Sequence, residues 1–295
     1  MRHRTMHLRY GPSRHQRIGL RPPHDRHRQR HATAIVLHGG FWRWPYGRLL
    51  MRRAIGDLRG RGWWVADIEY RRLGRLGGGG GFPATFDDAE VAVRHVHATT
   101  GGPLVLIGHS AGGHLALCAA HAVAGSVPLA GVVAIAAPTD LEALVQAGHP
   151  HARAITGIDT ERDVGSRPTP SGPTAGGPPR ASRLGAARAA VTSPIRMAPF
   201  GVPIHAVHSE IDDVVDVGQS RRFIAAAANA GDAATLTIVP DESHRAALRP
   251  SSTTWRRARR AAEDFVTDRA ASSLQVVATA PDEDIVGTDV PRSTR

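Results

Sequence analysis

A serine with one glycine two residues before it and another two residues after it lies in the run Gly108-His109-Ser110-Ala111-Gly112. The preceding PLVLI is typical of a buried strand, and the following AGGHLALCAA is typical of a helix made of small residues. This order predicts a tight turn that presents Ser110 as a nucleophile, with glycines where larger side chains would clash. The first amides of the helix would face developing negative charge. The alternative is a glycine-rich turn in which the serine only caps the helix.

A pair of glycines follows the first apolar run of the chain, ATAIVLH, in the sequence His38-Gly39-Gly40-Phe41-Trp42. An oxyanion hole needs backbone amides that no side chain obstructs, and glycines at a strand end supply them. We predict the amides of Gly40 and Phe41, together with that of Ala111, as the donors. The alternative is an ordinary turn at the end of a strand. In either case we assign His38 to holding the loop by a hydrogen bond, not to proton transfer.

An acid and a histidine follow the serine in the chain order that a serine, acid and histidine triad requires. Asp212 follows the apolar run VPIHAVHS, and its neighbour Asp213 leaves the choice of acid open. His244 follows the run ATLTIVP and is the one histidine downstream of the acid. The alternative for Asp212 is an Asx turn or a helix cap. We predict His244 as the general base and Asp212 as the residue that orients it.

Other aromatic and imidazole side chains flank these residues. Trp42 and Trp44 would line an acyl or aromatic pocket; the alternative is that they cover the edge of a sheet. His109 precedes the serine and is predicted to contact substrate. The remaining histidines form no H-E-x-x-H motif or carboxylate-supported triad, so the sequence predicts no metal site. Cys118 is the single cysteine, which excludes an internal disulfide framework, and its small-residue helix predicts packing in the core.

These residues need strands and helices in a particular order to position them. Apolar and β-branched runs predict buried strands at 32–38, 63–70, 103–109, 129–137, 202–209 and 234–240. Helical patterns lie at 48–60, 84–99, 111–125, 218–230 and 250–268. Strands that alternate with helices indicate parallel βαβ units. We therefore predict an α/β fold: a doubly wound, mostly parallel sheet flanked by helices.

Composition divides the chain into three parts. Residues 1–30 form an Arg- and His-rich N-terminal segment in which weak strand-like fragments indicate a first hairpin. Residues 31–268 form the predicted domain, interrupted at 157–190 by a segment rich in Pro, Gly, Ser and Arg that we interpret as a disordered or degenerate cap insertion. Residues 269–295 are low in apolar content and are predicted to be a disordered tail.

The 295-residue chain has a net charge of +11, which raises the question of nucleic-acid binding. Residues 1–30 hold nine Arg and one Asp, a net +8, which leaves +3 for the rest. All 37 basic residues are Arg, whereas phosphate-binding surfaces usually mix Arg with Lys. Nucleic acid is therefore a disfavoured partner.

No apolar run of the sequence reaches the roughly 18 residues that a membrane-spanning helix needs. The start of the chain also lacks the apolar region of a secretory signal. A cytoplasmic protein acting on a small molecule is the default expectation. The oligomeric state is left open.

The motifs resemble those of the α/β-hydrolase fold superfamily. HGGFWRWPYG, EYRR and GHSAGGHLAL look like the single-domain esterases that include acetylxylan or feruloyl esterase-like and kynurenine formamidase-like proteins. The resemblance covers about 8–156 and 197–268. It implies Ser110 as nucleophile, Asp212 as acid and His244 as base. The sequence departs from the group at Ser209, where a glycine is usual, and at 157–190, which replaces an ordered cap.

The expected function is hydrolysis of carboxylic esters of small or aromatic substrates, through a Ser-His-Asp triad and an acyl-enzyme intermediate. The resemblance implies no metal or organic cofactor. Two alternatives stay open. One is an arylformamidase-like amidase that cleaves an N-formyl aromatic amine. The other is a catalytically impaired hydrolase-fold protein that binds a ligand without turning it over.

Overall fold

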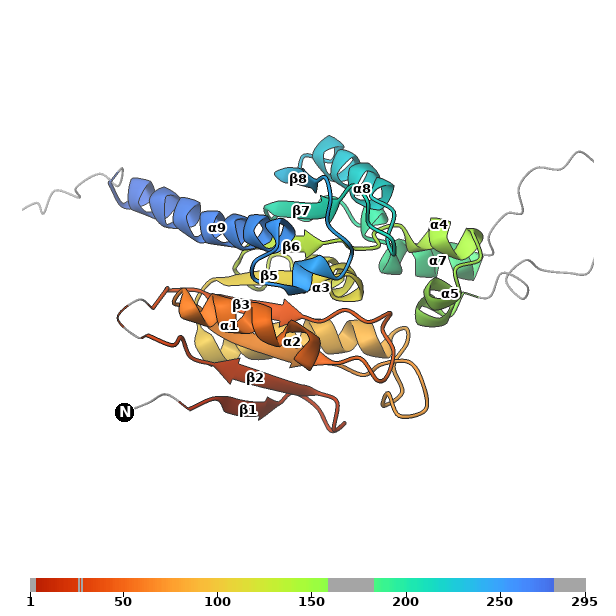
Figure 1. The fold of residues 1–295 in the computed structure, drawn as a ribbon, viewed down its shortest axis with the longest axis horizontal. Coiled ribbons are helices and arrows are strands. Elements are labelled where there is room, and N and C mark those ends of the chain that lie inside the picture. The colour runs from red at the N-terminus through yellow and green to blue at the C-terminus, as the bar shows by residue number, and fades with distance from the viewer. Residues whose placement is uncertain (1–3, 26, 28, 159–182, 279–295) are drawn as a thin grey trace, which may run out of the picture.

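The computed structural model describes residues 4–25, 27, 29–158 and 183–278. In this part of the chain, eight strands form one sheet with helices on both faces (Figure 1). The strands are β1 (Met6–Arg9), β2 (Arg17–Arg21), β3 (Thr33–Leu37), β4 (Trp64–Glu69), β5 (Leu104–His109), β6 (Leu129–Ile135), β7 (Ile204–Ser209) and β8 (Ala234–Val239). The α-helices are α1 (Arg52–Gly60), α2 (Ala84–Thr100), α3 (Ala111–Ala122), α4 (Leu141–Gln146), α5 (Pro150–Thr156), α7 (Arg183–Thr192), α8 (Gly218–Asn229) and α9 (Thr253–Ala278). Single 3₁₀ turns are η2 (Arg48–Met51), η3 (Pro194–Arg196) and η4 (Ala246–Leu248).

The sheet is parallel except at one edge. The strand order is β1-β2-β4-β3-β5-β6-β7-β8, and only the pairs β1·β2 and β2·β4 are antiparallel among the described strands. The parallel strands, β4 to β8 in this order, therefore have their carboxyl ends along the same edge, where ligands bind in open α/β sheets. The predicted α/β class, with its doubly wound and mostly parallel sheet, is confirmed.

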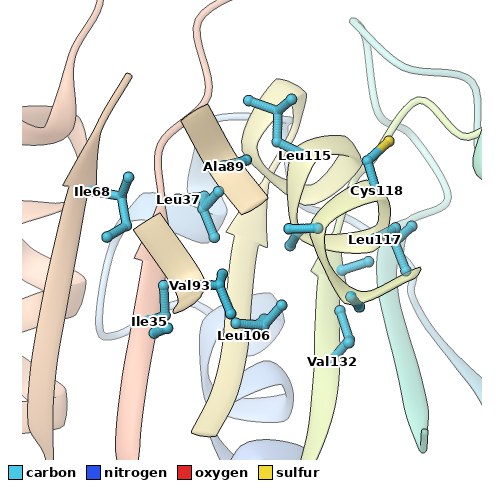
Figure 2. Packing of buried hydrophobic residues seen from close by; sticks show 14 of the residues in the cluster. Ile35, Leu37, Ile68, Ala89, Val93, Leu106, Leu115, Leu117, Cys118 and Val132 are labelled. Carbon is cyan, nitrogen blue, oxygen red and sulfur yellow. The ribbon is translucent and has the colours of Figure 1, made fainter. Parts of the chain in front are cut away.

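Two apolar cores lie on opposite faces of the sheet. On one face α2 and α3 cover Leu37 and Leu106, with Val93 and Leu115 packed against them (Figure 2). On the other face α1 and α9 cover the neighbouring strand residues, among them Val105. Successive residues of a strand point to opposite faces, so a strand between two cores must be apolar at every position. This explains the continuous apolar runs that predicted β3 and β5.

The segment after β6 differs from its prediction. Residues 159–182, most of the predicted cap insertion at 157–190, lie outside the described residues. Residues 183–190, however, belong to helix α7, which packs with α4 and α5, and the expectation of disorder was wrong for them. The sequence RLGAARAAVT consists mostly of Ala, Arg and Leu, which are good helix formers. The composition of residues 157–190 is dominated by the Pro- and Gly-rich residues before this helix, which explains why the whole segment was expected to be disordered.

Helix α9 also differs from its prediction, because it continues to Ala278 instead of ending near Asp268. Residues 269–278 contain neither Gly nor Pro, so no helix-stopping signal precedes Pro281. The first ten residues of the predicted 269–295 tail are therefore helical, and residues 279–295 lie outside the described residues. The domain boundaries inferred from composition stay a prediction.

Backbone segments approach closely at the junction of β5 and α3. A Cβ atom at Gly108 would lie 2.1 Å from the carbonyl oxygen of Gly112. A Cβ atom at Gly112 would lie 2.2 Å from the carbonyl oxygen of Leu37, on the neighbouring strand. Because these neighbours are backbone atoms, neither can rotate away. The two glycines let helix α3 start directly after β5 and against β3.

Replacing Gly108 with Ala should therefore lower the free energy of unfolding by at least about 1–3 kcal/mol, the usual cost of overpacking a core. The matched control is Gly56→Ala in helix α1, where an added Cβ would meet nothing within 4 Å. That variant should gain about 0.5–1 kcal/mol from helix propensity. Urea denaturation of both variants measures the difference. Equal effects would show that the junction is not tightly packed.

Candidate active site

Ser110 occupies the residue between β5 and α3, at the carboxyl edge of the sheet. Its backbone has φ 55° and ψ −124°, a conformation that residues other than glycine rarely adopt. Its amide donates a 2.8 Å hydrogen bond to the carbonyl of Ile135, at the end of β6. Gly39 is its neighbour on the other side, because a Cβ atom there would lie 3.1 Å from the Ser110 Cβ. Ser110 thus lies between the ends of three adjacent strands, β3, β5 and β6.

The carboxylate of Asp212 lies beside the ring of His244. The two residues follow the neighbouring strands β7 and β8, and His244 Nδ1 is 2.8 Å from Asp212 Oδ2. The other carboxylate oxygen accepts the amides of Val214 and Val215 at 2.9 and 2.8 Å. The Asp212 side chain is only 1% exposed. The acid is therefore buried, but both of its oxygens have donors.

A second histidine also contacts the Asp212 carboxylate. His208 Nε2 lies 3.4 Å from Asp212 Oδ2 and 2.9 Å from the carbonyl of Val215, while Nδ1 lies 2.7 Å from Ser220 Oγ. Burial alone would raise the pKa of Asp212, but the hydrogen bonds from His208, His244 and the Val215 amide outweigh it. They hold the pKa well below its usual range, so the carboxylate is charged at neutral pH.

Asp213 contacts the same histidine differently. Its Oδ1 accepts a long hydrogen bond of 3.3 Å from the backbone amide of His244, not from the ring. Asp213 is an exposed residue, whereas the carboxylate of Asp212 is buried. Asp212 therefore contacts the ring of His244, whereas Asp213 contacts the His244 backbone.

The loop after β3 has an unusual backbone. Gly40, Phe41 and Trp42 all have positive φ angles, of 110°, 56° and 56°. Hydrogen bonds hold this shape: the amide of Arg43 donates to the Gly40 carbonyl at 2.9 Å, and that of Leu73 donates to the Trp42 carbonyl at 2.7 Å. Since the loop and Ser110 line one cavity, its backbone lies beside the serine. Ala111, the third predicted amide donor, is the first residue of α3, so no earlier turn of helix supplies its N–H with an acceptor.

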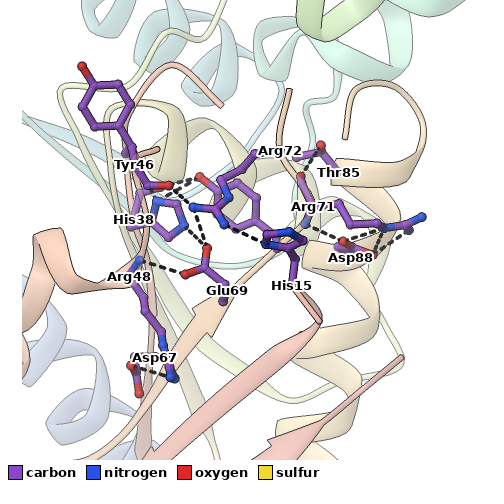
Figure 3. Close-up of polar contacts among 12 residues, drawn as sticks. His15, His38, Tyr46, Arg48, Asp67, Glu69, Arg71, Arg72, Thr85 and Asp88 are labelled. Atoms are coloured by element: carbon purple, nitrogen blue, oxygen red, sulfur yellow. Dashed lines mark hydrogen bonds and ion pairs between the residues drawn. The ribbon is translucent and has the colours of Figure 1, made fainter. Parts of the chain in front are cut away.

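A buried polar network lies beneath this loop (Figure 3). His38 Nδ1 lies 2.7 Å from the carbonyl of Gly39, and its Nε2 lies 3.1 Å from the Glu69 carboxylate. Arg72 pairs with Glu69 at 3.2 Å and also donates to the carbonyl of Tyr46, farther along the loop. Burial would raise the pKa of Glu69, but the contacts with His38 and Arg72 lower it overall. The predicted structural role of His38 matches these contacts.

His109 lines the cavity and also supports the histidine opposite it. Its Nε2–H donates to the carbonyl of His244 at 2.9 Å, and the two rings lie 4.6 Å apart between centroids. Burial, with a smaller contribution from His244, lowers the pKa of His109 to about 3. The ring is therefore neutral at physiological pH, with its proton on Nε2.

Two cavities meet at Ser110. The larger, of about 240 Å³, is lined by Ser110, His244, His109 and the loop residues Gly40 and Phe41, among others. The smaller, of about 60 Å³, is lined by Ser110 and Ala111 together with Phe41, Trp42 and both apolar and polar residues of the segments after β6 and β7. Every predicted catalytic or oxyanion residue except the buried Asp212 therefore borders one of these spaces.

The two predicted tryptophans lie in different places. Trp42 is buried, borders the smaller cavity and packs edge-on against His114, with ring centroids 5.3 Å apart. Trp44 is 42% exposed and borders neither cavity; the Arg72 guanidinium lies over its ring at 5.5 Å. The structure therefore brings Trp42, but not Trp44, together with the serine.

Three polar residues near the site were not predicted. His208 contacts Asp212, and Ser220 contacts His208. The spacing of four residues between His208 and Asp212 was a usable signal for the first contact. Arg245 borders the larger cavity, and its position directly after His244 was the only hint.

Across the residues that the structure describes, no three His, Cys, Asp or Glu side chains gather so that they could hold a metal ion. Within the same residues, no helix has the length and apolarity to cross a membrane.

Comparison with known proteins agrees with this fold. A family model described as the alpha/beta hydrolase family matches residues 34–257, including the serine turn and both loops after β7 and β8. Because this match spans most of the chain, the protein belongs to the alpha/beta hydrolase family. A comparison with curated proteins finds no significant match.

Several solved structures of esterases are similar to this one. A truncated carbohydrate esterase from gut microbiota gives a TM-score of 0.68 at 18% identity, over 88% of this chain and 95% of that chain. A thermophilic esterase from the Planctomycetes species Thermogutta terrifontis, with bound butyrate, gives 0.65 at 18% identity, over 90% and 94%. An inhibited esterase B from Lactobacillus rhamnosis gives 0.70 at 15% identity, over 92% and 89%. At these identities the likeness establishes a shared fold.

The low pKa of His109 predicts a pH dependence of stability. The folded pKa of about 3 lies below the ordinary 6.5, so between these values the unfolded chain binds more protons than the folded one. The contribution of this neutral histidine to stability is therefore complete above pH 6.5 and is lost as the pH falls toward 3. In His109→Gln, which cannot titrate, the free energy of unfolding should fall less steeply over this range. His114, with a pKa lowered to about 4, titrates in both proteins and cancels. Denaturant titrations across the range measure the two slopes; equal slopes would contradict the prediction.

Proposed function

We propose that the protein is a serine hydrolase that cleaves carboxylic esters through Ser110, His244 and Asp212. The observation that carries the proposal is the buried, charged Asp212 at 2.8 Å from His244 Nδ1, with His244 and Ser110 lining one cavity. Membership of the alpha/beta hydrolase family and the esterase activity named for its structural neighbours support the same chemistry.

The charge on Asp212 determines which nitrogen of His244 can act as a base. An ionised carboxylate only accepts hydrogen bonds, so Nδ1 must carry the proton that joins the two side chains. In the neutral ring, the lone pair is then on Nε2, the nitrogen away from the acid. That nitrogen takes the proton of the Ser110 hydroxyl as its oxygen attacks the substrate carbonyl. Asp212 also stabilises the imidazolium that results.

The negative charge that develops on the carbonyl oxygen needs donors already in place. We assign these to the amides of Gly40, Phe41 and Ala111. Ala111 begins helix α3, whose N-terminus favours negative charge. The positive φ angles of the loop, maintained by its own hydrogen bonds and by Arg72 beneath it, fix the direction of the other two amides. Preorganised donors of this kind cost no rearrangement during the reaction.

The reaction then proceeds in two halves. The tetrahedral intermediate collapses as the bond to the leaving alcohol breaks, and His244 returns its proton to that oxygen. Ser110 is left as an acyl ester. Water attacks this ester with His244 again as base, the carboxylic acid is released, and the proton returns to Ser110. All of these steps use side chains and amides of the chain itself, so we expect no cofactor. The same steps apply to amides, and comparing acetyl esters with formyl anilides would rank the two substrate classes.

Asp212→Asn should lower kcat for 4-nitrophenyl acetate by about 10³–10⁴, because the amide favours the wrong tautomer of His244. Asp213→Asn is the matched control: it changes a neighbouring carboxylate that accepts a hydrogen bond from the His244 backbone amide, and it should retain most activity. Steady-state kinetics of the two variants, with circular dichroism to establish folding, test the assignment. A larger loss in Asp213→Asn would identify that residue as the acid, and a folded wild-type chain without hydrolysis would contradict the function.

A further inference from the structure

The two cavities at Ser110 are unequal in size and in chemistry. The smaller, of about 60 Å³, is lined by apolar side chains such as Trp42, Pro138 and Leu144, and also by the polar residues His149, Asp216 and Gln219. The larger, of about 240 Å³, has aromatic and apolar walls that include Tyr46 and Leu248. A substrate bound across the serine would therefore place a small group on one side and a larger group on the other.

The direction of proton transfer assigns the two sides. In the proposed reaction His244 gives its proton to the leaving oxygen, so the leaving group must lie on the side of His244. His244 lines the larger cavity and does not line the smaller one. The larger cavity therefore holds the leaving group, and the smaller holds the acyl group. This assignment rests on the proposed function.

Arg245 is the one residue with a fixed charge among those that line the larger cavity in the described part of the chain. Arg245 follows His244 directly in the sequence and is an exposed residue at the wall of the larger cavity. Within the described residues, its guanidinium has no hydrogen bond or ion pair. Asp213, in the loop after β7, accepts a hydrogen bond from the His244 amide.

Three arginines near the loop after β3 are paired with acids. Arg48 contacts Asp67, Arg71 contacts Asp88, and Arg72 contacts Glu69 (Figure 3). Each of these charges is neutralised within the protein. Arg245 differs from them because it has no such partner among the described residues and borders a cavity with no acid in its lining. An anionic ligand would supply the missing partner, and a carboxylate matches the planar guanidinium best.

We infer that the preferred substrates are esters of a short acyl group with an aromatic or apolar alcohol that carries a carboxylate, and that Arg245 binds this carboxylate. The carboxylate would lie on the leaving group, away from the reacting carbonyl. Arg245 is thus a specificity residue, and it takes no part in proton transfer.

The test uses two esters with the same acetyl group and nearly the same ring, 4-acetoxybenzoate and its neutral methyl ester. The measured quantity is the ratio of kcat/KM for the anionic ester to that for the neutral ester. Arg245→Gln should lower this ratio about tenfold, the effect of one charge-assisted contact. Arg245→Lys, which keeps the charge, should retain part of it. Arg249→Gln removes an exposed arginine that borders neither cavity and should leave the ratio unchanged.

Salt provides an independent measurement on the wild-type protein. The ratio should fall as ionic strength rises from about 0.01 M to about 1 M, because the screening length shrinks from about 30 Å to about 3 Å. An unchanged ratio in Arg245→Gln, or equal losses in Arg245→Gln and Arg249→Gln, would overturn the inference while hydrolysis of both esters still supported the proposed function. Hydrolysis of neither ester by the wild-type chain would contradict both.

Discussion

The contact between Asp212 and His244 depends on two parallel strands that end side by side. β7 and β8 pair in register up to Ser209 and Val239, so the loops after them start from the same level of the sheet. The acid comes three residues after the first strand and the histidine five residues after the second. Neither loop needs to be long. The amide of Glu210 donates to the Val239 carbonyl, and the amide of Glu242 donates to Ser209 Oγ, so each loop is tied to the end of the neighbouring strand. A register shift between these strands would separate the two side chains, whatever the conformation of the serine turn.

The other half of the site depends on buried charge. His38 and Arg72 are almost fully buried, and both contact Glu69 below the loop that carries the proposed oxyanion amides. Burying charged groups is costly, and their pairing offsets the cost only where the geometry is good. Such an arrangement adds little to stability by itself, but it allows the loop few alternatives. Arg72 reaches the Tyr46 carbonyl, while His38 reaches the Gly39 carbonyl, so the network holds both ends of the loop.

The sequence was informative where function depends on local spacing. Ser110 lies between a buried strand and a helix, and the glycines around it are required by backbone contacts that hold in any chain with this turn. The order of Asp212 and His244 after their strands could also be predicted, because parallel strands bring their carboxyl ends together. The roles of these residues in catalysis remain proposals. Their positions in the fold could be anticipated without the structure.

Features that depend on tertiary packing could not be predicted. The contact of His208 with both Asp212 and Ser220 joins a strand, a loop and a helix; the spacing of four residues hints at the first contact, but nothing in the sequence indicates the contact with Ser220. Trp42 and Trp44 are two residues apart in one motif, yet one is buried and the other exposed, because the backbone turns between them. The position of Arg245 is similar: the chain has 37 arginines, and only the fold shows that this one borders the same cavity as Ser110.

The most direct test of the central claim is labelling with a fluorophosphonate, followed by mass spectrometry to find the modified residue. If Ser110 is a nucleophile activated by His244, the probe should modify one serine, Ser110, and the modification should become far slower in a folded His244→Asn variant. The Ser110→Ala variant serves as the blank. Labelling of a different residue, or no labelling of the folded wild-type protein, would contradict the account.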